Sequence, residues 1–162
     1  MPDESLYNLV HDAARRRDVC DAVADLYRRL AVVIDERKPR CDASGRCCRF
    51  EEFGHRLYVT TIELAAFVAS DDIAIEATTK SSLPIYQPPG GCPFQFNKLC
   101  SVHTRRPFGC RMFYCDPTAQ DWQQEQYEQF HAEIKLLHER FGIPYRYMEW
   151  RGALRELGIT IG

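Results

Sequence analysis

Residues 92–115 read CPFQFNKLCSVHTRRPFGCRMFYC, and this stretch decides how the chain is organised. A second cysteine-rich stretch lies upstream, where residues 41–49 read CDASGRCCR. Glycine and proline punctuate both stretches, so both are predicted to be loops between regular elements. Loops of this kind allow several sulfur atoms to converge on one centre. The seven loop cysteines are Cys41, Cys47, Cys48, Cys92, Cys100, Cys110 and Cys115.

Whether the cysteines bind a metal or form disulfides depends on the redox state of the compartment. The N-terminal residues 1–5 lack the basic start and apolar run of a secretory signal, so a cytoplasmic location is expected. In a reducing compartment clustered cysteines favour metal binding over disulfides. Two alternatives stay open: four disulfides in an exported protein, and a metal-free redox switch that uses Cys47 and Cys48. The eighth cysteine, Cys20, falls in a helical pattern and is predicted to be a core residue.

Length and composition exclude several functional classes. The 162 residues suit one domain, with an N-terminal helical segment at 1–40 and a cysteine-cluster region at 41–162. The net charge of −2 gives no global positive field, so no nucleic-acid partner is expected. No apolar run is long enough to span a membrane. Phosphate-binding glycine motifs and the G-x-S-x-G nucleophile motif are absent from the sequence. A protein partner is compatible with these features.

Apolar periodicity predicts a mainly α-helical fold. Residues 5–37 carry an apolar stripe at helical spacing and are predicted to be helical. A second long helix is predicted over 119–141, ended by Gly142, and a short one over 148–157. Residues 70–91 look irregular. The helices are therefore expected to surround the two cysteine-rich loops.

A short strand and a capping motif separate the two cysteine-rich loops. Residues 57–60 have strand composition. Thr60 followed by Glu63 matches a capping box, with Thr60 as N-cap, and predicts a helix that runs through Val68.

The cysteine spacing bears on the choice of metal. Structural zinc usually takes paired ligands with two to four residues between them, and only Cys110 and Cys115, with four between them, fall in that range. The spacings also differ from those of ferredoxins. An all-thiolate site assembled from dispersed loops remains, and soft thiolates select iron–sulfur clusters, zinc or copper(I). We expect an iron–sulfur cluster, [4Fe-4S] above all, with zinc as the alternative.

Several other residues are candidates for a role at this site. His103 is a candidate nitrogen ligand but is expected to be a plain loop histidine, and for the enzyme alternative Glu149 and His103 are the candidate bases. Glu128 and His131 have the spacing of a di-iron helix motif, but its second copy is absent, so a solvated helix face is predicted. The C-terminal aromatic residues are predicted to pack in the core or to cover the metal site. Arginines flank the cysteines and either donate to the sulfurs or are solvated: Arg46, Arg49, Arg105, Arg106 and Arg111.

The two cysteine-rich stretches resemble the YkgJ-type cysteine-cluster proteins, a family of zinc- or iron-chelating domains. The resemblance covers residues 41–157. The matching pieces are Gly45-Arg46-Cys47-Cys48-Arg49, Cys92-Pro93-Phe94, Cys100-Ser101-Val102, Arg106-Pro107, Cys110-Arg111-Met112-Phe113 and the ending Ile143-Pro144-Tyr145-Arg146-Tyr147-Met148-Glu149-Trp150.

The resemblance implies metal binding, with one departure in the ligand set. Ser44 stands where the family motif has its second cysteine, and Cys115 is a candidate replacement. Flagellin lysine-N-methylases look related through the same cysteines, which implies a metal-dependent modifying enzyme as a further alternative. The ligands that the resemblance implies are Cys41, Cys47, Cys48, Cys92, Cys100 and Cys110.

Overall fold

The computed structural model describes residues 5–39, 57–69, 106–112, 114 and 116–159, together with the backbone of residues 95–96 and 99–100. The predicted loop at 41–49, the irregular segment at 70–91 and most of the stretch at 92–105 lie outside the described residues. The described part is mostly helical, as the sequence predicts. Its helices are α1 (Leu6–Ala14), α2 (Arg17–Arg37), α4 (Thr61–Ala69), α6 (Phe108–Arg111), the 3₁₀ turn η3 (Pro117–Ala119), α7 (Gln120–Phe141) and α8 (Trp150–Glu156). Its strands are β1 (Tyr58–Thr60), β2 (Gln95–Phe96), β3 (Leu99–Cys100) and β4 (Tyr147–Glu149).

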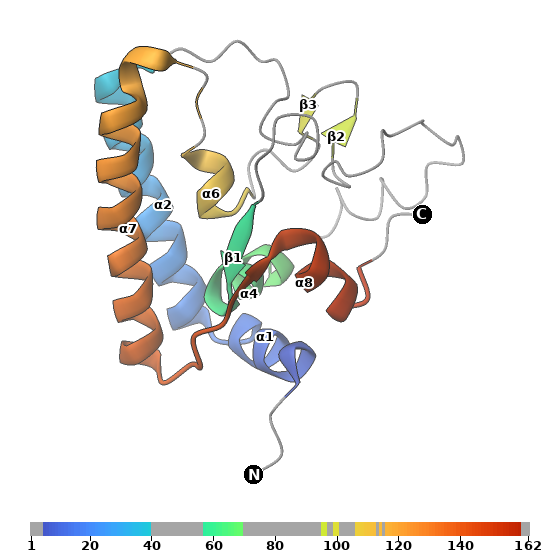
Figure 1. Ribbon diagram of the computed structural model, residues 1–162. Helices are drawn as coiled ribbons and strands as arrows, with labels where there is room; N and C mark the ends of the chain where they lie inside the picture. The colour runs from blue at the N-terminus through green and yellow to red at the C-terminus, as the bar shows by residue number, and fades with distance from the viewer. Residues whose placement is uncertain are drawn as a thin grey trace.

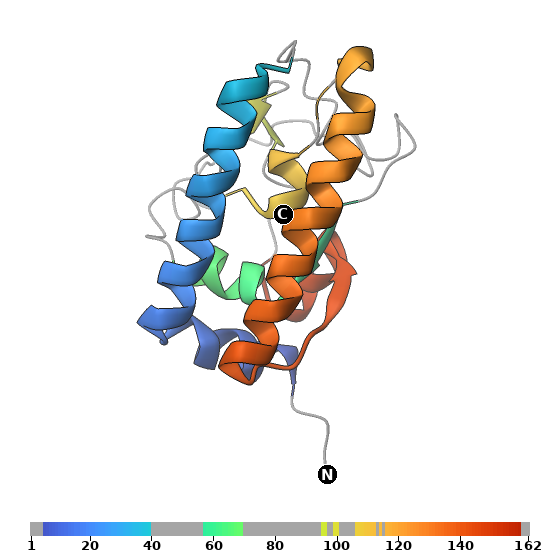
Figure 2. The ribbon, with the colours of Figure 1, turned by 90° about the vertical axis from the view of Figure 1, so that its left-hand side faces the viewer.

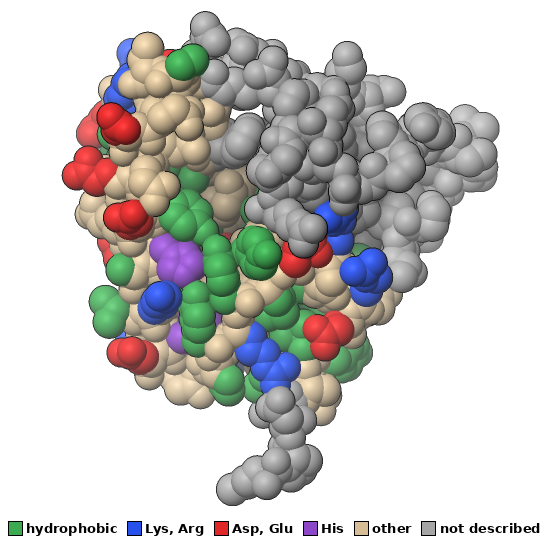
Figure 3. Space-filling model, in the orientation of Figure 1, with side chains coloured by type: hydrophobic (Ala, Val, Ile, Leu, Met, Phe, Trp, Pro, Cys, Tyr) green, Lys and Arg blue, Asp and Glu red, His purple; other side chains and the backbone are tan. Residues whose placement is uncertain are grey.

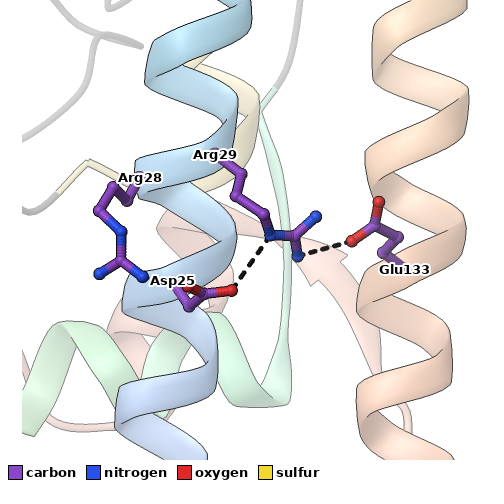
Figure 4. A network of polar contacts seen from close by, with 4 residues as sticks. All are labelled: Asp25, Arg28, Arg29 and Glu133. Carbon is purple, nitrogen blue, oxygen red and sulfur yellow. Dashed lines mark hydrogen bonds and ion pairs between the residues drawn. The ribbon is translucent and has the colours of Figure 1, made fainter.

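Helices α2 and α7 form a long antiparallel pair along one side of the molecule (Figures 1 and 2). Each buries an apolar stripe, which supplies most of the stability of such a helix. On the exposed side, Arg29 of α2 bonds Glu133 of α7 at 2.7 Å and Asp25 of its own helix at 3.1 Å (Figure 4). Arg28 also bonds Asp25. Helix α7 ends at Gly142, whose φ of 65° is the left-handed conformation that the sequence predicts for this position.

The helical structure predicted over residues 5–37 is confirmed, but it is divided into two helices, α1 and α2, and the break between them was not predicted. Arg16 is extended, with φ −88° and ψ 107°, and separates α1 from α2. Its guanidinium donates to the carbonyl of Phe141 at 2.9 Å and to Asp18, which holds the bend against the end of α7. The apolar periodicity continues through the break, because both helices bury a stripe. A straight helix could not pack its first part on α4 and its second on both α4 and α7.

Strand β1 confirms the strand predicted near residues 57–60, but its partner was not predicted. β1 pairs antiparallel with β4, with Tyr58 opposite Glu149 and Thr60 opposite Tyr147. The N–H of Trp150 donates to the carbonyl of Leu57 at 2.8 Å and extends the pairing. The predicted helix at 148–157 therefore begins later, at Trp150. β4 has only three residues and forms through a non-local pairing that short-range periodicity does not reveal.

The capping box at Thr60 and Glu63 is confirmed in its reciprocal half. The backbone N–H of Thr60 donates to Oε2 of Glu63 at 2.9 Å, and the Thr60 hydroxyl donates to the same oxygen at 2.8 Å. Helix α4 then runs from Thr61 to Ala69 and is buried on nearly all sides. It lies between two hydrophobic clusters and contributes to both of them.

The short helix α6 also joins the two clusters. Cys110 packs in the cluster that α1, β1, α4 and α8 build, whereas Phe108 and Met112 pack in the cluster between α2 and α7. Figure 1 shows α6 beside the pair of long helices, and in the view of Figure 2 it is seen behind them, in the gap between the two ribbons. The core around α6 is therefore made of segments distant in sequence. Within the described ranges, none of the helices is both long and apolar enough to cross a membrane.

Candidate metal-site helix and a tyrosine–histidine cluster

The described residues include two of the eight cysteines with their side chains. Cys110 lies in α6 and is buried, with 8% of its surface exposed. Cys20 lies in α2, is partly buried, and its thiol donates to the carbonyl of Ala14 at 3.6 Å. Cys100 is described by its backbone alone, as the residue of β3 opposite Gln95. The other predicted ligands lie outside the described residues: Cys41, Cys47, Cys48, Cys92 and Cys115.

Helix α6 is held at its start by a carboxylate from another element. Pro107 is the N-cap residue and supplies no side-chain hydrogen bond. Oε1 of Glu63, from the first turn of α4, accepts instead from the N–H of Phe108 at 2.8 Å. Glu63 thus ties together the start of α4 and the start of α6, 45 residues apart. Burial raises the pKa of Glu63, although the hydrogen bonds from Thr60 and Phe108 act in the opposite direction.

Gly109 allows α6 to approach β1 closely. A Cβ atom at this position would lie 2.5 Å from Cδ1 of Leu57 and 3.7 Å from the carbonyl oxygen of Tyr58. Leu57 is itself buried, so it has little room to move. The absence of a side chain at Gly109 therefore sets how near Cys110 lies to the sheet.

Arg111 fixes the other end of α6. Its guanidinium lies 4.1 Å from the centroid of the Tyr27 ring, and its Nε donates to the carbonyl of Arg106 at 2.7 Å. Burial lowers the pKa of Arg111, although the guanidinium group still keeps its charge near neutral pH. A charged group is thereby held beside the residue that the sequence predicts as a metal ligand.

The hydroxyl of Tyr27 is an unusual feature of this region. It is buried and makes no hydrogen bond within the described part of the chain. The N–H of Phe108 lies close enough to lower the pKa of Tyr27, but it donates its hydrogen bond to Glu63. Burial raises the pKa of Tyr27 well above its ordinary value. The hydroxyl is therefore neutral and carries an unmet hydrogen-bonding capacity next to α6.

The other candidate site residues are Glu149, which the structure describes, and residues outside the described ranges. His103 and Arg105 lie outside the described residues. Glu149 caps α8 by accepting from the N–H of Gly152 at 2.9 Å and pairs with Arg151 at 2.7 Å. Burial alone would raise the pKa of Glu149, but these hydrogen bonds outweigh it and the pKa lies below the ordinary value. Among residues that the structure describes, no group of three or more His, Cys, Asp or Glu side chains is placed to hold a metal ion.

A tyrosine–histidine cluster lies on the face that carries α7, β1 and β4. We define it as Tyr58, Tyr127, His131, Tyr145 and Tyr147. Nε2 of His131 lies 2.8 Å from the hydroxyl oxygen of Tyr145, and the hydroxyls of Tyr127 and Tyr147 are 2.8 Å apart. The ring of Tyr147 stacks with those of Tyr58 and Tyr145, at centroid distances of 5.2 and 6.3 Å. Figure 3 shows histidine and hydrophobic side chains gathered on this face.

The prediction that Glu128 and His131 form a solvated helix face is wrong for His131. Its side chain is partly buried and meets three tyrosine rings. Glu128 is exposed and accepts from Gln124 at 2.7 Å. Two of these tyrosines, Tyr145 and Tyr147, come from residues 145–147, and Tyr147 belongs to β4, which pairs with β1. The helical spacing of His131 and His138 on one face was the signal available in the sequence.

The aromatic residues near the C-terminus, which were predicted to pack in the core or to cover the metal site, divide into two groups. Trp150 is buried, and its ring packs edge-on against Phe67 at 5.1 Å. Tyr145 and Tyr147 are instead exposed over 39% and 44% of their surface. The tyrosines therefore form an accessible aromatic surface beside the core.

His138 lies beneath the tyrosine–histidine cluster and is buried. Its Nε2 accepts from the N–H of Ile62 at 3.4 Å, and its Nδ1 lies 2.9 Å from the carbonyl oxygen of Ile134. Both bonds form only when Nδ1 carries the single proton of a neutral imidazole. Burial lowers the pKa of His138, which agrees with this assignment.

Comparison with protein families, characterised proteins and solved structures finds no match to this chain.

Proposed function

We propose that the protein binds a metal centre through its loop cysteines, and that this centre is an iron–sulfur cluster, most simply [4Fe-4S]. The observation that carries the proposal is the support given to Cys110. It lies on a four-residue helix that Glu63 holds from α4, that Gly109 brings close to β1, and that Arg111 anchors on Tyr27. So short a helix has little stability of its own, and burying the carboxylate of Glu63 to hold it costs free energy. This cost is consistent with a function that depends on the position of Cys110.

The donor set fits such a group chemically. The ligands would be drawn from Cys41, Cys47, Cys48, Cys92, Cys100, Cys110 and Cys115, and thiolates are the ligands that iron–sulfur clusters take. Four thiolates around an oxidised cubane leave a charge of about −2. Arg111 lies next to Cys110 in sequence and is partly buried, so it offers charge compensation on the protein side.

The cluster would supply one-electron chemistry or a structural link between the two cysteine-rich stretches. The chain's own residues would position the ligands, exclude water and stabilise the thiolates. Glu63 and Gly109 position α6, Phe108 and Met112 exclude water from its inner side, and Arg111 favours the thiolate form of a nearby cysteine.

The test is metal analysis on protein purified without oxygen, with acid-labile sulfide and an absorption spectrum. Iron with matching sulfide and a broad band at about 400 nm is the expected result. Cys110→Ala should lose most of the metal, whereas Cys20→Ala, a cysteine outside the loops, should retain it. Metal retained equally by both variants would remove Cys110 from the ligand set. Protein with neither iron nor sulfide would overturn the iron–sulfur proposal.

Zinc without sulfide is the outcome that would replace the cluster with a structural thiolate site. That protein would be colourless and would unfold when zinc is chelated. The enzyme alternative receives no support from Glu149, because its cap and ion pair keep it ionised as a structural group. The iron–sulfur and zinc proposals are therefore favoured over the enzyme alternative, and one elemental analysis distinguishes between them.

A further inference from the structure

Tyr145 and His131 form a hydrogen-bonded phenol–imidazole pair at the surface. The Tyr145 hydroxyl oxygen lies 2.8 Å from Nε2 of His131, within the range over which protons transfer between side chains. Tyr145 is 39% exposed, so a small reagent in solution reaches its ring. The two residues come from different elements, His131 from α7 and Tyr145 from the segment before β4. The contact is thus built by the tertiary fold.

The protonation state of His131 suits a base. Burial lowers the pKa of His131, and the positive charge of Lys135 lowers it further. The imidazole is therefore neutral at pH 7, and its Nε2 accepts the Tyr145 proton when Nδ1 carries the ring proton. A phenol that loses an electron becomes a strong acid, so a neutral base at hydrogen-bond distance makes that loss easier.

We propose that Tyr145 and His131 are a redox site at which Tyr145 gives up one electron while its phenolic proton passes to His131. The electron goes to a one-electron oxidant, such as an organic radical or an oxidised metal complex. The O–H bond of Tyr145 breaks and an N–H bond forms at Nε2 of His131. The products are a neutral tyrosyl radical, an imidazolium and the reduced oxidant. A one-electron reductant reverses the step, and His131 returns the proton.

The hydrogen-bond partner of Tyr145 distinguishes it from Tyr147, Tyr27 and Tyr7. The Tyr147 hydroxyl meets that of Tyr127, and a phenol oxygen is a far weaker base than imidazole. Tyr27 is buried and its hydroxyl has no partner within the described part of the chain. Tyr7 provides a natural comparison, because its ring lies 4.1 Å from that of His11, yet no hydrogen bond joins these two described residues.

The neighbouring rings give the oxidised site a connection inward. Tyr145 stacks with Tyr147, and the Tyr147 hydroxyl bonds that of Tyr127. The Tyr127 ring in turn stacks with Phe108 of α6 at 5.1 Å. These contacts join the exposed pair to the helix that carries Cys110. The redox assignment rests on Tyr145 and His131 themselves and does not require a metal at Cys110.

The test is photo-oxidation of the full-length protein by ruthenium tris-bipyridine with an electron-accepting quencher, followed by rapid freezing and electron paramagnetic resonance. The expected result is a tyrosyl signal that loses more than half of its intensity in Tyr145→Phe. The matched control Tyr7→Phe should keep its signal, because Tyr7 is 50% exposed and lies beside a histidine without the hydrogen bond. A signal unchanged in Tyr145→Phe, or reduced equally in both variants, would overturn the proposal.

A second measurement separates proton transfer from simple packing. In the parent protein, formation of the radical should slow in D₂O, because the proton moves with the electron. His131→Phe keeps an aromatic ring at the site but removes the base, so radical formation should slow strongly, because the phenolic proton must then pass to water, a far weaker base than imidazole. A variant that is folded by circular dichroism and forms the radical at the parent rate would show that His131 is not the proton acceptor.

Discussion

The carboxylate of Glu63 accepts a hydrogen bond from the backbone N–H of Phe108 at 2.8 Å, so that the first turn of α4 caps α6 from a distance of 45 residues. The same side chain also closes its own capping box at Thr60. One buried carboxylate therefore fixes two helix starts at once. The position of Cys110, two residues after Phe108, depends on it.

Glu63→Gln should destabilise the protein by about 1–3 kcal/mol, because an amide NH₂ would face backbone N–H donors that are then left unsatisfied. Urea unfolding monitored by circular dichroism measures the change in the free energy of unfolding. Glu128→Gln is the matched control, since Glu128 is exposed on α7 and should change stability by no more than about 0.5 kcal/mol. Equal losses in the two variants would contradict the dual capping role.

Gly109→Ala should cost about 1–3 kcal/mol, because the new Cβ would lie 2.5 Å from buried Leu57 unless α6 shifts. Gly152→Ala provides the contrast: its Cβ would meet its nearest neighbours only at 3.7 Å, and alanine should stabilise α8 by up to about 1 kcal/mol. Thermal unfolding of both variants measures whether stability falls in the first and rises in the second. Stabilisation of Gly109→Ala would show that α6 does not pack on β1 as described.

Tyr27→Phe should raise the free energy of unfolding by about 1–3 kcal/mol, because it removes a buried hydroxyl that has no partner within the described residues. The ring that Arg111 covers is retained. Tyr127→Phe removes a hydroxyl that does have a partner, Tyr147, and should lower stability by about 0.5–1.5 kcal/mol. Denaturant titrations of the two variants should therefore differ in sign. A loss of stability in Tyr27→Phe would reveal a partner for its hydroxyl.

His138 should make stability depend on pH. Burial lowers its pKa in the folded protein, so the unfolded chain takes up a proton first as the pH falls. The contribution of His138 to the free energy of unfolding is therefore fully present above the ordinary histidine pKa of about 6.5, and it declines as the pH decreases below that value. The Tyr145 ring packs against the His138 ring, and the nearby His131 lowers the pKa of His138 further; neither residue supplies a negative charge at these pH values.

The check is the free energy of unfolding measured between pH 8 and pH 5 in the parent and in His138→Gln. The variant should lose part of the pH dependence, because glutamine does not titrate. Burial also lowers the pKa of His131, but His131 is only partly buried, so His131→Gln should reduce the pH dependence by less than His138→Gln. An unchanged slope in His138→Gln would contradict the assignment of a buried neutral imidazole.

Most of the long elements could be predicted from local pattern. The apolar stripe of α7, its end at Gly142 and the capping box of α4 all depend on residues within a few positions of one another. The break at Arg16 could not be predicted, because both sides of it are helical and apolar. It is stabilised by the Phe141 carbonyl, 125 residues away. Strand β4 was missed for the same reason, since three residues become a strand only where β1 pairs with them.

The candidate site shows the same division. The sequence predicted Cys110 and Arg111 as site residues from their composition and from a family resemblance, and it predicted Glu63 only as a local cap. The metal and the ligand set remain predictions. The role of Glu63 at α6 and the pairing of His131 with Tyr145 appeared only with the tertiary structure, because each joins elements that no local spacing relates.

The sequence by itself determined the helical character of this protein and the gathering of seven cysteines in two stretches, because periodicity and composition are local properties of the chain. The tertiary structure alone decided which buried groups meet: a carboxylate with a distant helix start, a histidine with an exposed tyrosine, and a hydroxyl with no partner in the described region. The physical reason is that burial and hydrogen-bond partnership depend on packing between distant segments, and these set the charge and reactivity of each side chain.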